Sequence, residues 1–109
     1  GETNDNSKLP LTISEPSTIK LKFTVNKPND INAPLHVELS GRIHALIYLN
    51  GRLIGRYYPS NSQSMFYLPE PYLDKENELT ILAIPAEDNA AVNVLFKPYM
   101  VTKTINLTL

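Results

Sequence analysis

Four carboxylates lie close together in the chain, at Glu70, Asp74, Glu76 and Glu78. Two carboxyl groups held about 5–5.5 Å apart could cleave a glycosidic bond, one as nucleophile and the other as acid. That chemistry needs an environment which raises the pKa of one group, such as burial. The segment has the polar and charged composition of a turn, so we expect solvated surface carboxylates and no catalytic residue.

His36 and His44 are the only histidines, and each alternates with apolar residues. A zinc site would need a third or fourth ligand at suitable spacing, and the sequence offers none and contains no cysteine. A Ser-His-Asp hydrolase would need a nucleophile motif that is also missing. We therefore expect no metal and no cofactor, with both histidines at a sheet face or an interface.

Aromatic side chains are better candidates for binding than the carboxylates or histidines. The tyrosines and phenylalanines that could present a flat face are Tyr48, Tyr57, Tyr58, Phe66, Tyr67, Tyr72 and Tyr99. Such rings pack against apolar groups or stack on the C–H face of a sugar, while Arg56 could donate hydrogen bonds. Tyr57 and Tyr58 are neighbours on one predicted strand and cannot both face the core. One of them must contact a loop, solvent, another domain or a ligand.

The overall composition is that of an ordinary globular domain. The chain has 109 residues, 42% of them hydrophobic and 19% charged, with a formal net charge of −1. This charge argues against a nucleic-acid partner, which would require a basic patch, and against capture by an anionic membrane. The compartment stays open, and we favour an extracytoplasmic or secreted location.

The apolar residues predict β structure in about eight segments. In residues 18–25, Ile19, Leu21, Phe23 and Val25 alternate with polar residues, as in a strand with one wet face. The other segments are 35–39, 43–49, 52–58, 65–68, 78–84, 92–96 and 101–109. Turn residues separate them at the spacing typical of sandwiches and barrels. Residues 1–10 are polar after a lone Gly1, so we expect a linker or a terminus left by cloning, then one domain over residues 11–109.

The strongest local signal is Asn50-Gly51, which predicts a two-residue type I′ turn because both residues tolerate positive φ. The expected register pairs Leu49 with Arg52, Tyr48 with Leu53, Ile47 with Ile54 and Ala45 with Arg56. Both faces of the hairpin hold apolar groups, which favours strands inside a sheet.

A longer pattern extends from this turn. It consists of residues 47–57, which end in Gly-Arg-Tyr, then Phe66-Tyr67-Leu68-Pro69, then Glu76-Asn77-Glu78 before another strand. This order and spacing resemble the jelly-roll domain on the C-terminal side of family 35 glycoside hydrolases, the β-galactosidases. In the loop after Tyr58, Gln63 also agrees with the family pattern. The resemblance implies an antiparallel, galactose-binding-like jelly-roll sandwich without catalytic residues of its own.

The resemblance also implies a role and a partner. The domain would pack against the catalytic barrel of a parent hydrolase and could contact galactosides. We take Arg56, Tyr57, Tyr58, Gln63 and Tyr67 as candidate carbohydrate or interdomain contacts. Two alternatives remain open, an autonomous carbohydrate-binding module and a protein-interaction sandwich.

Overall fold

The structure is a computed structural model that describes residues 2–5, 11–25, 35–59, 65–97 and 101–108. These residues form ten strands and one 3-10 turn. The strands are β1 (Glu2–Asp5), β2 (Leu11–Ile13), β3 (Ser17–Val25), β4 (His36–Gly41), β5 (Ile43–Leu49), β6 (Arg52–Tyr57), β7 (Met65–Tyr67), β8 (Glu76–Pro85), β9 (Ala90–Lys97) and β10 (Val101–Thr108). The 3-10 turn η1 (Glu70–Tyr72) falls in the segment expected to form a turn.

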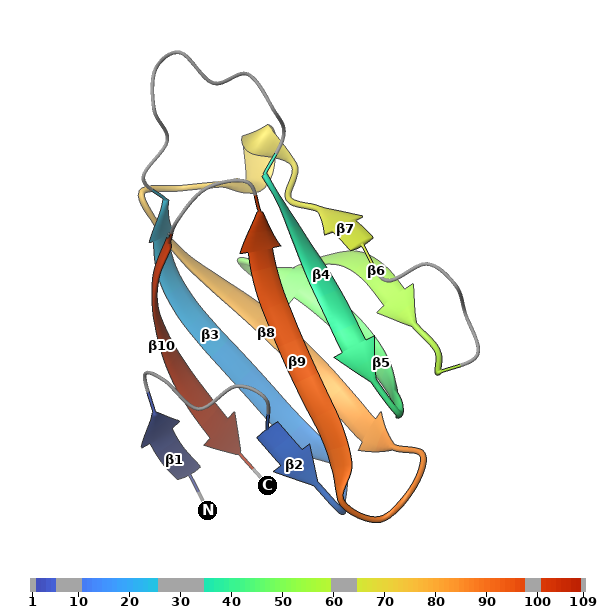
Figure 1. The fold of residues 1–109 in the computed structure, drawn as a ribbon. Helices are drawn as coiled ribbons and strands as arrows, with labels where there is room; N and C mark the ends of the chain where they lie inside the picture. Colours follow the sequence, from blue (N-terminus) through green and yellow to red (C-terminus); the bar gives the residue numbers. More distant parts are fainter. Residues whose placement is uncertain (1, 6–10, 26–34, 60–64, 98–100, 109) are drawn as a thin grey trace.

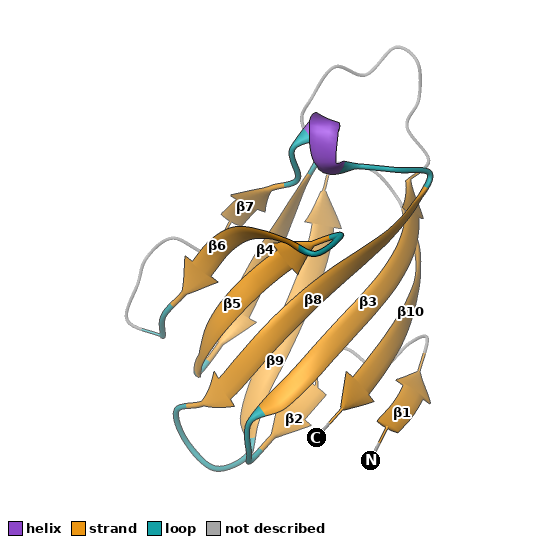
Figure 2. Ribbon diagram, turned by 180° about the vertical axis from the view of Figure 1, so that it is seen from behind, coloured by secondary structure: helices purple, strands orange, loops and turns teal. Residues whose placement is uncertain are grey.

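The strands form two antiparallel sheets packed face to face, as Figures 1 and 2 show from opposite sides. The larger sheet has the order β1-β10-β3-β8-β5-β6, and the smaller has the order β2-β9-β4-β7. The predicted all-β jelly-roll sandwich is therefore confirmed, and its eight expected segments correspond to β3 through β10.

The sequence interpretation missed both strands at the start of the chain. Residues 1–10 were expected to be a linker, but Glu2–Asp5 form β1, which pairs with residues Ile105 to Thr108 of β10. Backbone hydrogen bonds define such an edge strand, and they leave no hydrophobic pattern in a polar sequence. Leu11–Ile13 form β2, a three-residue strand that pairs with β9. Residues 6–10 lie outside the described part of the chain.

The core lies between the two sheets and is built from alternate residues of several strands in both sheets. The larger sheet contributes Ile19, Leu21, Phe23, Ile43, Ala45, Ile47, Leu49, Leu79, Ile81 and Ala83, and the smaller contributes Ile13, Leu35, Val37, Leu39, Phe66, Ala90, Val92 and Val94. Burying one large aliphatic side chain of this kind stabilises a fold by about 1.5–3 kcal/mol. The period-2 alternation seen in the sequence is therefore the pattern of core contacts.

The hairpin at Asn50-Gly51 forms as predicted, with φ of 51° at Asn50 and 83° at Gly51. Its register agrees with the prediction only at Leu49↔Arg52 and Tyr48↔Leu53. Beyond these pairs a β-bulge shifts the register, because Ile47 lies opposite Gly55 and Ile54 is the extra residue.

The bulge decides which way the family-like Gly-Arg-Tyr segment faces. Arg56 pairs with Leu46 on the outer face and Tyr57 pairs with buried Ala45, instead of Ala45 with Arg56 as expected. Without the bulge, Arg56 would share the inner face with Ala45 and a charged guanidinium would be buried. The expectation that both hairpin strands lie inside the sheet is correct for β5 and wrong for β6, which is an edge strand.

Candidate functional site

A groove of about 570 Å³ lies on the outer face of the larger sheet, over β5, β6 and β8. Strand pairing places its side chains in two rows. The first row is Leu82, Leu46 and Arg56, and the second begins with Ile84 and His44. Tyr58, just after β6, completes the second row because its ring centroid lies 5.7 Å from that of His44, edge to face. We call this set of six side chains the sheet groove.

Much of the sheet groove is apolar surface open to solvent. Ile84 is 56% exposed, Tyr58 43% and Leu82 39%. Arg56 is also exposed, and its guanidinium forms no hydrogen bond or ion pair with another described residue. No acidic side chain is among the described residues that line the groove. The groove therefore combines apolar and aromatic surface with one cation that has no counter-charge in this lining.

Tyr57 borders the sheet groove, but its side chain is buried. Its hydroxyl donates a hydrogen bond of 2.9 Å to the carbonyl of Gly41. The ring therefore belongs to the core, and of the adjacent pair only Tyr58 offers a surface for binding.

The other predicted contact residues do not join this groove. Tyr67 lies on β7 in the smaller sheet, 55% exposed, with its ring 5.8 Å from that of His36. It lines a separate hollow of about 390 Å³ beside β6, which we call the edge hollow. Gln63 lies outside the described residues. Of the candidate set, the structure brings together Arg56 and Tyr58 and separates them from Tyr67.

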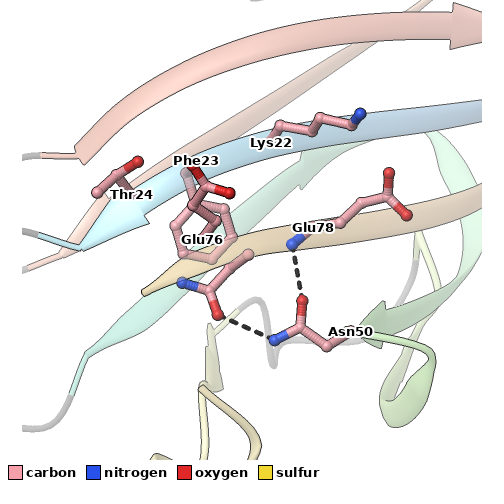
Figure 3. Close-up of a pocket in the computed structure, with 7 residues that line it drawn as sticks. Lys22, Phe23, Thr24, Asn50, Glu76 and Glu78 are labelled. Carbon is pink, nitrogen blue, oxygen red and sulfur yellow. Dashed lines mark hydrogen bonds between the residues drawn. The ribbon is translucent and has the colours of Figure 1, made fainter. Parts of the chain in front are cut away.

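A third pocket, of about 490 Å³, lies where the Asn50-Gly51 turn meets the start of β8 (Figure 3). Its lining includes Lys22, Thr24, Glu76 and Glu78. We call it the turn pocket. Both asparagines in its lining, Asn50 and Asn77, form hydrogen bonds within the protein, so we interpret the pocket as structural.

Hydrogen bonds of the two asparagines connect the Asn50-Gly51 turn, residues 72–74 and the start of β8. The Asn50 amide nitrogen donates to the Tyr72 carbonyl at 2.8 Å and to Asn77 Oδ1 at 2.9 Å, while Asn50 Oδ1 accepts from the Glu78 backbone N–H at 2.8 Å. Asn77 is 5% exposed, accepts from the Asp74 N–H and donates to the Asp74 carbonyl. Asn77 therefore closes the turn before β8 through hydrogen bonds to nearby backbone.

The carboxylates lie on the surface, as their surroundings predicted. Glu70, Asp74 and Glu76 are exposed and Glu78 is half-buried. Among the described residues there is no group of three or more His, Asp or Glu placed to hold a metal ion. Within the same ranges, no helix is long and apolar enough to span a membrane.

Sequence interpretation missed four members of the sheet groove, Leu46, His44, Leu82 and Ile84. A signal for them was present, because both β5 and β8 carry apolar residues on the face away from the core. Leu46 and Tyr48 alternate with core residues of β5, as Leu82 and Ile84 do in β8. Apolar residues on both faces of a strand indicate either a covered sheet or an exposed apolar surface.

Comparison with protein families matches residues 16–78, more than half of the chain, to the family described as "Beta-galactosidase, galactose-binding domain". The chain belongs to this family. Domains of this type are non-catalytic, and membership assigns a carbohydrate-binding or accessory role. No curated protein matches the chain.

Proposed function

We propose that this chain is the accessory domain of a family 35 β-galactosidase and lies on the C-terminal side of its catalytic barrel. The observation that carries this proposal is that the three pieces of the family-like pattern contact one another. The Phe66 ring packs where a Cβ on Gly55 would stand, 2.4 Å from Phe66 Cδ1. The Asn50 side chain bonds to Asn77 and to the Glu78 backbone. The three pieces of the pattern are therefore joined by direct contacts, which supports a common origin with that family.

The edge hollow is the surface best suited to packing against the barrel. Its described lining is Leu53, Ile54, Met65, Phe66, Tyr67, Pro69 and Tyr72, which carries no charge. Leu53 is 47% exposed and Tyr67 55% exposed. Exposed apolar side chains that meet across two sheet edges are typical of a surface covered by another domain. Burying them would contribute about 25 cal/mol for each Å² of apolar surface removed from water.

Two experiments test this proposal. The complete coding sequence should contain a glycosidase barrel upstream of residues 1–109, and a coding sequence without one would refute it. In the full-length protein, the double change Leu53→Asp and Tyr67→Asp should loosen the interface and speed proteolytic cleavage between barrel and accessory domain. The matched control is Ile84→Asp, which alters a side chain as exposed as Tyr67 on a different face. Equal cleavage rates for the two variants would exclude the edge hollow as the packing surface.

A further inference from the structure

We propose that the sheet groove binds a pyranoside that carries a carboxylate, such as a uronic acid residue of a glycan. The proposal rests on the accessory role in a carbohydrate-active enzyme and adds a site and a ligand class to it. The site consists of Tyr58 and His44, the aliphatic pair Leu82 and Ile84, and Arg56.

Tyr58 supplies the stacking surface. Its ring is 43% exposed, and its edge-to-face contact with His44, at an interplanar angle of 79°, restricts its orientation. A ring held this way is already in place before a ligand arrives, which reduces the entropy cost of binding. Pyranose C–H faces pack on aromatic surfaces of this kind, and the phenol hydroxyl can form a hydrogen bond with a sugar hydroxyl.

The aliphatic side of the groove complements a second apolar surface of the ligand. Leu82 and Ile84 lie on β8, two residues apart on the same outer face, and Ile84 pairs with His44. Across the groove from them, Arg56 and Tyr58 occupy the β6 side. A ligand spanning the groove would thus meet hydrocarbon on one side and an aromatic ring with a cation on the other.

Arg56 sets the charge of the ligand. Its guanidinium has no hydrogen-bond or ion-pair partner among the described residues, and no described acidic residue lines the groove. A guanidinium pairs with a carboxylate through two parallel hydrogen bonds, a geometry that a hydroxyl cannot reproduce. The groove therefore favours an acidic sugar over a neutral one.

The other two pockets lack this combination of groups. The edge hollow has no charged residue in its described lining, and the asparagines of the turn pocket are engaged with backbone and with each other. The sheet groove, at about 570 Å³, also falls within the usual range of small-molecule sites, roughly 300–1,000 Å³.

The test is an NMR titration of the ¹⁵N-labelled 109-residue chain with methyl galacturonide, methyl galactoside and a short acidic peptide. Methyl galacturonide should shift the amide signals of His44, Arg56 and Tyr58 and bind more tightly than methyl galactoside. Arg56→Gln should weaken galacturonide binding about fivefold and leave galactoside binding unchanged. Tyr58→Ala should weaken both about tenfold.

Two variants serve as matched controls. Arg52 lies on the same strand, but its guanidinium lies 4.9 Å from the ring centroid of Tyr72, so Arg52→Gln should leave binding unchanged. Tyr67 lies on the smaller sheet and is more exposed than Tyr58, at 55% against 43%, so Tyr67→Ala should also have no effect. Because Arg56 and Tyr58 are exposed, their variants should keep the amide spectrum of the folded domain.

Several outcomes would overturn the assignment. Equal affinity for the two sugars would refute the role of Arg56, and no shift in the groove amides would refute the site. Tighter binding of the acidic peptide would instead make the groove a protein-docking surface. None of these results bears on the upstream barrel or on the edge hollow, so the accessory role is tested by separate experiments.

Discussion

Replacing Gly55 by alanine tests the contact that joins the hairpin to the smaller sheet. The backbone φ of Gly55 does not lie in the positive region, so an alanine could adopt it. Its Cβ, however, would lie 2.4 Å from Phe66 Cδ1 and 2.6 Å from Phe66 Cε1. Phe66 is only 7% exposed and belongs to the core, so its ring can move away only by disturbing its neighbours.

The expected effect is the balance of two terms. A strain-free change from glycine to alanine stabilises a protein by about 0.4–1 kcal/mol, because the unfolded chain loses conformational freedom. Overpacking a well-filled core costs about 1–3 kcal/mol. We therefore expect Gly55→Ala to lower the free energy of unfolding by about 1–2 kcal/mol, which corresponds to a fall in Tm of roughly 5–10 °C for a domain of this size.

Urea unfolding followed by far-UV circular dichroism measures this effect, with a double-mutant cycle to locate its cause. In a Phe66→Leu background the ring is gone, so the cost of Gly55→Ala should largely vanish. Gly51→Ala is the control, since Gly51 has φ of 83° and no neighbouring atom within 4 Å of an added Cβ. Its cost should be about 1 kcal/mol in both backgrounds, because it comes from the backbone alone. An equal cost of Gly55→Ala in the two backgrounds would refute the Phe66 contact.

Three further changes test the hydrogen bonds that hold the turns. Asn77→Ala should lower the free energy of unfolding by about 3 kcal/mol in urea titrations, because the Asp74 N–H and carbonyl lose their partner. Tyr57→Phe should cost about 1 kcal/mol by the same assay, since it removes only the bond to the Gly41 carbonyl, and a neutral result would show that this bond adds nothing. Asn50→Gly keeps a residue that accepts positive φ, so the hairpin should remain. The change removes the side-chain carbonyl that accepts from the Glu78 backbone N–H, so hydrogen exchange at that N–H should accelerate.

The fold followed from sequence where a segment carries its own pattern. The alternation of Ile19, Leu21 and Phe23 with lysines and threonines predicted β3. The Asn50-Gly51 pair predicted the turn between β5 and β6. The terminal strand β1 has no such pattern, because only pairing with β10 makes it a strand.

The candidate site was predictable only in part. The adjacency of Tyr57 and Tyr58 showed that one ring must leave the core, but sequence could not say which. The bulge after Tyr48↔Leu53 decided it by shifting Tyr57 opposite Ala45. Leu82 and Ile84 come from β8, which joins β5 through tertiary pairing rather than through a local turn, so no spacing rule placed them beside Arg56.

We propose that this domain is a non-catalytic part of a β-galactosidase, and a comparison of two catalytic activities tests that proposal. The full-length coding product and the chain of residues 1–109 should be assayed side by side on a chromogenic β-galactoside. We expect turnover by the full-length product and none by the 109-residue chain at any concentration. Turnover by the 109-residue chain at an enzyme-like rate, or an inactive full-length product, would contradict it.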